Sequence, residues 1–240
     1  MEPGIAGGAA ATNPAAGKQF DDAIIVRPAT LDDAQDVAQI LAEAFPSLYR
    51  STFGKLKEAR MVRLLTALYR AGTLSLEATR VAERSGGVIG LVVLHVGKSI
   101  GRGSAAHYWR VLRRELPWWR LPHAFFGGIS VNAMLSKRIP AGPELVYIEA
   151  LAVAAADRGA GIGTKLLEDA ADWASRSRRR QLALHVLEAN YGARRLYERT
   201  GFRQWHPRGQ TRRSILVPFS TRPPGWSAIL MLRKLHPSPR

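Results

Sequence analysis

The feature that most constrains the fold is a glycine-rich loop between a hydrophobic run and a helical pattern. The run at 145–153 reads LVYIEALAV, and such continuous hydrophobicity is typical of a central strand. The loop at 158–163 reads RGAGIG, and a helix with one apolar side is predicted at 164–175. Glycines let a ligand approach the backbone, and a helix N-terminus presents free N–H groups with a partial positive charge. We therefore expect a turn that can hold a phosphate group.

This loop matches neither of two common phosphate-binding motifs. A P-loop has lysine followed by serine or threonine, whereas here Thr164 comes before Lys165. The G-x-G-x-G spacing also differs from the dinucleotide-binding pattern, and no suitable acidic residue follows the next strand. The glycines taken alone are therefore a weak signal.

The rest of the chain alternates between strand and helix patterns. A strand is expected at 23–27, followed by a helix that Thr30 caps, with Asp33 in a capping-box position, and that Pro46 ends. The turn at 85–87 reads SGG and indicates a hairpin. Further helices are expected at 56–71 and 190–200, and further strands at 76–83, 88–96, 181–187, 214–219 and 226–232.

Residues 97–142 form an insertion before the central strand, and it mixes aromatic residues with arginines. It is too long for a structureless connection in a compact domain, so one or two short helices are expected. One helical face would carry Tyr108, Trp109, Leu112 and Leu116, with Arg110, Arg113 and Arg114 largely off it.

The net charge of +16 is concentrated in two segments. Residues 98–138 carry eight basic residues and one acidic residue, and residues 203–240 carry eight basic residues and no acidic one. A clustered excess of this kind favours anionic ligands or surfaces. The alternative is that the arginines only decorate a solvated surface.

Composition excludes several classes of site. The chain has no cysteine, which excludes disulfides, thiolate metal sites and a cysteine nucleophile, and which suits the cytoplasm. No stretch reaches the roughly 18 consecutive apolar residues of a membrane span. The histidines show no metal-ligand spacing, so we expect no metal. Residues 1–22 are expected to be a disordered tail, and residues 236–240 a loose one.

A second motif lies on the helix predicted at 190–200. Asn190 and Tyr197 are seven residues apart, which is nearly two helical turns, so their side chains line one face. Asn190 is also a good N-cap residue. The alternatives are a plain helix cap for Asn190 and a packed ring for Tyr197.

The order of these parts resembles the GNAT superfamily of acyl-CoA-dependent N-acetyltransferases. The resemblance covers residues 23–235, as one domain with 97–142 inserted. It rests on R-x-x-G-x-G at 158–163, the preceding L-A-V at 151–153, and N-x-x-A-x-x-x-Y-E-x-x-G-F at 190–202. It implies an α/β (α+β) GNAT fold, with a mixed central sheet of six to seven strands that is splayed at the middle and flanked by helices.

The resemblance also implies roles for individual residues. Loop amides would hold the pyrophosphate of acetyl-CoA, and the residues concerned are Arg158, Gly159, Ala160, Gly161, Ile162, Gly163 and Thr164. Leu151, Ala152 and Val153 would pair with the pantetheine arm like an extra strand, and one of their amides would polarise the thioester carbonyl. Asn190 would contact the pantetheine, and Tyr197 would act as general acid for the departing thiolate. This direct transfer needs no covalent enzyme intermediate.

Glu149 is the candidate base. An amine with a pKa near the lysine value of about 10.4 is almost entirely protonated at pH 7, so a proton must be removed. Alternation along a strand puts Glu149 on one face with Leu151 and Tyr147, and Tyr147 stands where some family members carry a glutamate. Glu149 could take the proton directly or through a water. The alternatives are a carboxylate that orients the substrate and one that is paired to an arginine.

The acceptor is expected to be a primary amine on a small molecule or a protein. In the family's geometry the two basic segments border the acceptor side, so an anionic acceptor is favoured. The alternative is that this charge only steers the highly anionic acyl-CoA. The aromatic residues expected to roof it in part are Trp109, Trp118, Trp119, Phe125 and Phe126. His185 is expected to be a packed histidine, and the chain a monomer or homodimer.

Two readings from other classes remain open. One is an acyl-CoA-binding sensor without turnover, which a thiol-release assay would distinguish. The other is a binding protein whose insertion attaches to an anionic membrane surface. The sequence carries no nucleic-acid-binding motif.

Overall fold

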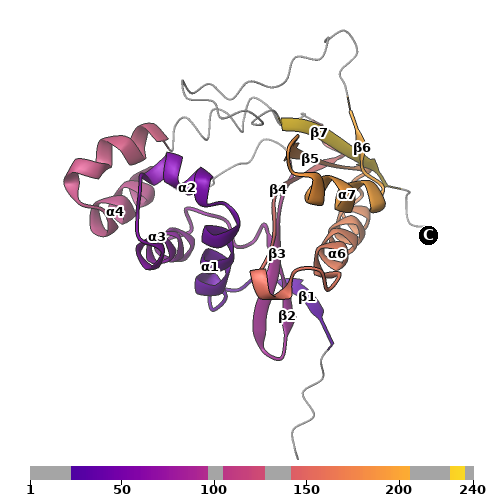
Figure 1. Cartoon of the computed structure of the whole chain (residues 1–240), viewed down its shortest axis with the longest axis horizontal. Coiled ribbons are helices and arrows are strands. Elements are labelled where there is room, and N and C mark those ends of the chain that lie inside the picture. Colours follow the sequence, from indigo (N-terminus) through magenta and orange to yellow (C-terminus); the bar gives the residue numbers. More distant parts are fainter. Residues whose placement is uncertain (1–22, 97–104, 128–141, 206–227, 236–240) are drawn as a thin grey trace, which may run out of the picture.

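A mixed sheet forms the centre of the molecule (Figure 1). The computed structural model describes residues 23–96, 105–127, 142–205 and 228–235, and within them the strand order is β1-β2-β3-β4-β5-β7-β6. Strands β4 and β5 pair in parallel, and the other pairs are antiparallel. The strands are β1 (Ile25–Pro28), β2 (Thr79–Arg84), β3 (Gly87–Val96), β4 (Leu145–Val153), β5 (Gln181–Leu187), β6 (Arg203–Gln204) and β7 (Ala228–Lys234).

Helices cover both faces of this sheet (Figure 1). The apolar side of α6 closes the core on one face, and α1 closes it on the other. Residues 121–127 are also helical. The helices are α1 (Ala34–Ala44), α2 (Pro46–Phe53), α3 (Glu58–Arg70), α4 (Ala105–Glu115), α6 (Ile162–Arg176) and α7 (Tyr191–Arg199), with short 3-10 turns η1 (Trp118–Arg120) and η2 (Ala155–Asp157).

The sheet is splayed between β4 and β5. Their pairing runs only from Leu145 opposite Gln181 to Ile148 opposite Leu184, although β4 continues to Val153 and β5 to Leu187. Beyond this point the facing edges of the two strands have no partner in the sheet. The expected mixed sheet, splayed at its middle and flanked by helices, is confirmed.

A β-bulge interrupts β4 at Glu149. Val93 lies opposite Ala150 and Leu94 opposite Ile148, so Glu149 has no residue opposite it on β3. An extra residue of this kind reverses the alternation of side chains beyond it. Ile148 and Leu151 therefore both pack on the α6 side. The expectation that Glu149 shares a face with Leu151 is wrong, because that expectation assumed unbroken alternation.

The start of α1 also differs from expectation. The helix begins at Ala34, and Thr30 does not cap it. Instead, the Asp33 carboxylate accepts hydrogen bonds from the Thr30 N–H at 2.7 Å and from its hydroxyl at 3.0 Å. Arg27 donates two further hydrogen bonds to Asp33, and these chiefly lower the pKa of that carboxyl to about 2. The bond from the Thr30 N–H is the half of the capping box that places Asp33 as expected. The other half is missing, because the Thr30 hydroxyl donates to the Asp33 carboxylate and does not accept from the Asp33 N–H.

Two further differences involve prolines and the chain end. Pro46 ends the first helix as expected, but it also begins α2, because a proline lacks the N–H that the first helical turn leaves unbonded. The strand expected at 214–219 lies outside the described residues. The last strand runs over Ala228–Lys234, a little later than the 226–232 expected.

The insertion forms an outer layer and does not roof the central strand. In the described residues, Leu112, Leu116 and Ala124 are buried in a cluster with α3 and residues of α1 and α2. Helix α1 packs on the sheet, α3 on α1, and α4 on α3 (Figure 1). The partial roof over the acceptor that was expected of the aromatic residues of the insertion stays a prediction, because no observation places the acceptor. The apolar face of α4 packs against α3 and not against β4.

Gly90, in the middle of β3, faces the start of α6. A Cβ there would lie 3.1 Å from the Ala152 carbonyl oxygen, 3.1 Å from Ile162 Cγ2 and 3.2 Å from Leu166 Cδ1. We expect Gly90→Ala to lower the free energy of unfolding by about 1–3 kcal/mol, because α6 must move away from the sheet. Urea unfolding followed by circular dichroism measures this loss.

Gly87→Ala in the same strand is the matched control for this substitution. Its nearest neighbour would be the Arg84 carbonyl oxygen at 3.7 Å, an ordinary contact. Its stability should be unchanged or slightly higher, since alanine restricts the unfolded chain. Equal losses in the two variants would contradict the close packing of α6 at Gly90.

Candidate active site

The loop between β4 and α6 presents a row of unbonded backbone N–H groups. Gly159 and Gly161 have φ angles of +87° and +79°, and Gly161 is the N-cap residue of α6 in the left-handed conformation. None of the N–H groups of residues 159–163 donates a hydrogen bond of normal geometry to another described residue. Because backbone donors are almost always paired, such a row at a helix N-terminus is suited to an anion.

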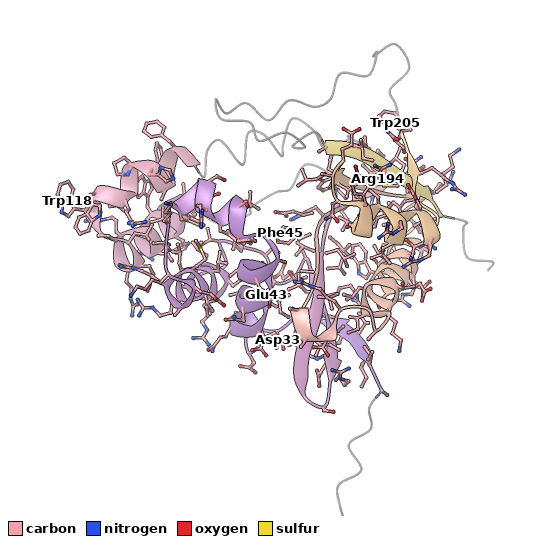
Figure 2. The ribbon with its side chains drawn as sticks, viewed as in Figure 1. Asp33, Glu43, Phe45, Trp118, Arg194 and Trp205 are labelled. Atoms are coloured by element: carbon pink, nitrogen blue, oxygen red, sulfur yellow. The ribbon has the colours of Figure 1, made fainter. Side chains whose placement is uncertain are left out.

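Side chains from three elements hold this loop in place. Arg158 donates to the Val153 carbonyl oxygen at 3.1 Å and to Glu43 of α1 at 3.3 Å, and Glu43 also accepts from the Ala155 N–H at 3.2 Å. Arg84 of β2 pairs with Asp157. Figure 2 labels Glu43 on α1. The arginine that opens the motif therefore tethers the loop, and its side chain is still 56% exposed.

The first turns of α6, which follow the loop, are also attached to the sheet. Ile162, the first residue of α6, is 1% exposed and belongs to the core. Arg80 of β2 pairs with Asp169 of α6 through two hydrogen bonds. The Thr164 N–H donates to the Gly161 carbonyl oxygen at 3.0 Å, so this amide belongs to the helix and is not part of the unbonded row.

Helix α7 lies against the start of α6. A Cβ on Gly163 would be 2.9 Å from Leu196 Cδ2, so glycine allows this close approach. Asn190 caps α7 as expected, since its side-chain oxygen accepts from the Ala193 N–H at 3.1 Å. The residues from the glycine loop and from α7 that the sequence singled out are thus brought to the same side of the sheet (Figure 1).

Tyr197 is buried among the residues of the α6 side. Its exposed fraction is 8%, and its ring centroid lies 5.8 Å from that of Phe202. Its hydroxyl makes no hydrogen bond to another described residue. Burial raises the pKa of this phenol to about 12. Tyr197 is therefore a neutral proton donor across the whole physiological pH range.

Glu149 belongs to a polar group on the opposite face. Its carboxylate is hydrogen-bonded to Nε2 of His95, a 7% exposed residue of β3. The Tyr49 and Tyr69 pKa values are raised chiefly by burial, and in part by the negative charge of Glu149. Among the described residues, Glu149 is thus paired to a histidine and not to an arginine.

Two more residues complete this face of the site. The Tyr147 hydroxyl and His185 Nδ1 are 3.1 Å apart, and their ring centroids are separated by 5.8 Å. Tyr147 lies opposite His95 in the register of β3 and β4. The expectation that Tyr147 and Glu149 share a face is confirmed, because the alternation of side chains is unbroken up to Glu149 and is reversed only beyond it.

His95 is the residue that the sequence did not reveal. It sits in the hydrophobic run of β3, and nothing nearby in the chain marks it as a partner of a carboxylate. Only the bulged register between β3 and β4 brings it to Glu149. A buried polar residue within an otherwise apolar strand is the one signal that could have pointed to it.

A cavity of about 320 Å³ opens among α1, α2 and α3. Glu43 and Tyr49 both line it, so it adjoins the contact between Glu43 and Arg158 that holds the loop. Among the residues described, no group of three or more histidine, cysteine or acidic side chains could hold a metal ion. No described helix is long and apolar enough to span a membrane.

Solved structures of acetyltransferases are similar to this chain. One acetyltransferase crystal structure has a TM-score of 0.59 and 20% identity, and the match covers 88% of this chain and 100% of that one. An N-acetyltransferase from Staphylococcus aureus Mu50 has a TM-score of 0.55 and 18% identity, with coverage of 88% and 100%. At such identities the likeness shows the fold. No curated protein matches the chain.

Family membership follows from the sequence match. A family model described as the acetyltransferase (GNAT) family matches residues 35–202. These residues span most of the chain and include β4, the glycine loop and α7. The chain therefore belongs to the GNAT acetyltransferase family.

Proposed function

We propose that this protein transfers an acetyl group from acetyl-CoA to a primary amine by direct attack. The observation that carries the proposal is the row of unbonded N–H groups at residues 159–163, at the point where β4 and β5 separate. A diphosphate supplies acceptors for such a row, and an extended arm supplies backbone-like partners for an open strand edge. Family membership supports the choice of acetyl-CoA.

The cosubstrate would then lie in the gap between β4 and β5. The N–H groups of 159–163 would bind the pyrophosphate, and the pantetheine arm would pair with Leu151, Ala152 and Val153. Asn190 is held at the start of α7, next to this gap, by its capping bond. An N–H group of β4 would stabilise the negative charge on the thioester oxygen as the tetrahedral intermediate forms.

The two candidate proton-transfer groups lie on opposite faces of β4. Tyr197 packs with Ile148 and Leu151 on the α6 side, and Glu149 contacts His95 on the other. A thioester between the separated strands is accessible from both faces. The amine nitrogen would attack the carbonyl carbon, Glu149 would accept the proton from nitrogen directly or through a water, and the C–S bond would break as Tyr197 protonates the thiolate.

The acceptor is proposed only as a primary amine. The Glu149 carboxylate carries the negative charge that would attract an ammonium group before it loses its proton. The anionic character expected of the acceptor stays a prediction, because both basic segments lie partly outside the described residues. The described part of the first segment lies on the outer layer formed by α4.

The glycine loop can be tested by substituting Gly161. An alanine there would have to adopt a φ of +79°, which is unfavourable for a residue with a Cβ. We expect the loop to relieve this strain by shifting, so that its N–H groups no longer point in a common direction. We expect Gly161→Ala to weaken acetyl-CoA binding at least about tenfold, as measured by isothermal titration calorimetry.

Gly86→Ala provides a matched strain control. Gly86 has a φ of +81° in the β2–β3 turn, and a Cβ at either glycine meets nothing within 4 Å. The two variants should lose similar stability, whereas Gly86→Ala should bind acetyl-CoA like the wild type. Equal affinity for acetyl-CoA in the two variants would show that the loop does not hold the pyrophosphate.

Tyr197→Phe tests the general acid. The ring still packs against Phe202, so the fold and the KM for acetyl-CoA should change little, while kcat falls about 100-fold or more. Because the pKa of Tyr197 is raised to about 12, the wild-type kcat should show no alkaline fall from this group up to pH 10. Tyr191→Phe, on the exposed first turn of the same helix, is the control and should keep full kcat. An unchanged kcat for Tyr197→Phe would refute the assignment.

Glu149→Gln tests the base. We expect kcat/KM to fall about 100-fold or more at pH 7. The difference from the wild type should shrink at alkaline pH, because more of the free amine is then already unprotonated. Rates of thiol release across pH 6–10 measure this. Glu144→Gln, which removes an exposed carboxylate from the turn just before the same strand, should leave the profile unchanged. A deficit that is constant with pH would indicate an orienting carboxylate instead.

A further inference from the structure

The insertion carries an exposed surface that the proposed chemistry does not use. The side chains of Trp118, Trp119 and Phe126 are 77%, 63% and 66% exposed. Figure 2 shows Trp118 at the outer edge of the molecule, far from Glu43 and the glycine loop. Large aromatic side chains gathered on a surface mark an interaction site, because burying them against a partner is strongly favourable.

These rings stand on a rigid support. Leu112, Leu116 and Ala124 are buried in the cluster with α3, and the rings of Trp109 and Phe125 stack at 5.1 Å. Gly127 lies directly on α2, where a Cβ would overlap the Thr52 carbonyl oxygen. The exposure of the three rings is therefore imposed by a packed scaffold.

The surroundings of the rings are positively charged. Arg110, Arg113 and Arg114 of α4 are exposed, and Arg120 donates to the Lys55 carbonyl oxygen at 2.7 Å. The only acidic residue among 105–127 is Glu115, which lies 3.8 Å from Arg63 and whose side chain is 17% exposed. No unpaired acidic side chain of this described stretch offsets the arginines.

We propose that this aromatic–arginine surface, formed by Arg110, Arg113, Arg114, Trp118, Trp119 and Phe126, binds an anionic lipid bilayer. Tryptophan and phenylalanine side chains enter the boundary between head groups and acyl chains, and guanidinium groups pair with lipid phosphates. Both components are needed, since either alone gives weak attachment.

Two other occupants fit this surface less well. A symmetric dimer through it would bring the same arginines of two copies together, and like charges repel. A single-stranded nucleic acid needs ring faces on which bases stack, whereas the Trp118 and Trp119 rings meet edge to face at 86°. The observations therefore favour the lipid surface.

Vesicle flotation of the full chain tests the proposal. We expect binding to phosphatidylcholine vesicles that contain phosphatidylglycerol, a blue shift of the tryptophan emission, and little binding to pure phosphatidylcholine. The triple variant Trp118→Ala, Trp119→Ala, Phe126→Ala should bind at least about tenfold more weakly. Ile25→Ala with Leu31→Ala, which removes exposed apolar side chains elsewhere, should bind like the wild type.

A second pair of variants separates a local charge effect from the net charge of +16. Each arginine near an anionic membrane contributes about fivefold to partitioning, so Arg110→Gln with Arg114→Gln should bind about 25-fold more weakly. Arg176→Gln with Arg199→Gln removes the same charge from exposed sites on α6 and α7 and should have a much smaller effect.

Several outcomes would overturn the proposal. One is an equal loss of vesicle binding in the two double arginine variants. Another is a triple variant that binds vesicles like the wild type, whether or not its oligomeric state changes. Binding to single-stranded DNA that depends on the three rings, without vesicle binding, would also do so. Acetyl-CoA binding by calorimetry shows that each variant is folded, and it is independent of the surface being tested.

Discussion

The separation of β4 from β5 is the constraint on which the rest of the site depends. Parallel pairing ends at Ile148 and Leu184, and both strands continue without each other. A strand edge in the middle of a sheet has hydrogen-bonding groups that need partners, so the gap favours an extended polar ligand. In the proposed function, the same gap would make a bound thioester accessible from both faces, so that the proposed acid, Tyr197, and the proposed base, Glu149, would act from opposite sides.

The position of α6 places the unbonded N–H groups of residues 159–163 at the end of this gap. Gly90 lets the helix start pack closely on β3 and β4, and the buried side chain of Ile162 fixes the first turn. Ion pairs from Arg80 and Arg84, with the contacts between Arg158 and Glu43, hold the loop from neighbouring elements. Because the N–H groups are already oriented, binding an anion there costs little further ordering.

Local sequence patterns predicted most of the elements and the glycine loop correctly. They failed where a residue far away in the chain decided the outcome. The pattern assigned Asp33 to a capping box, and its carboxylate accepts the expected hydrogen bond from the Thr30 N–H, but it also binds Arg27, which the pattern did not predict. The apolar face of α4 was readable from the sequence, whereas its partner, α3, was not. The pattern of an amphipathic helix predicts that one face is buried, but it does not predict which element packs against that face.

The sequence by itself determined the strand, the glycine loop and the helix that follows, since the periodicity of side chains and the freedom of glycine are local properties. It also determined the family, through motifs of fixed spacing at 158–163 and 190–202. Only the tertiary structure decided that Glu149 sits on a bulge, faces His95, and lies across β4 from Tyr197. The reason is physical: the face on which a strand residue lies depends on register with its neighbour, and register is set by pairing between distant segments.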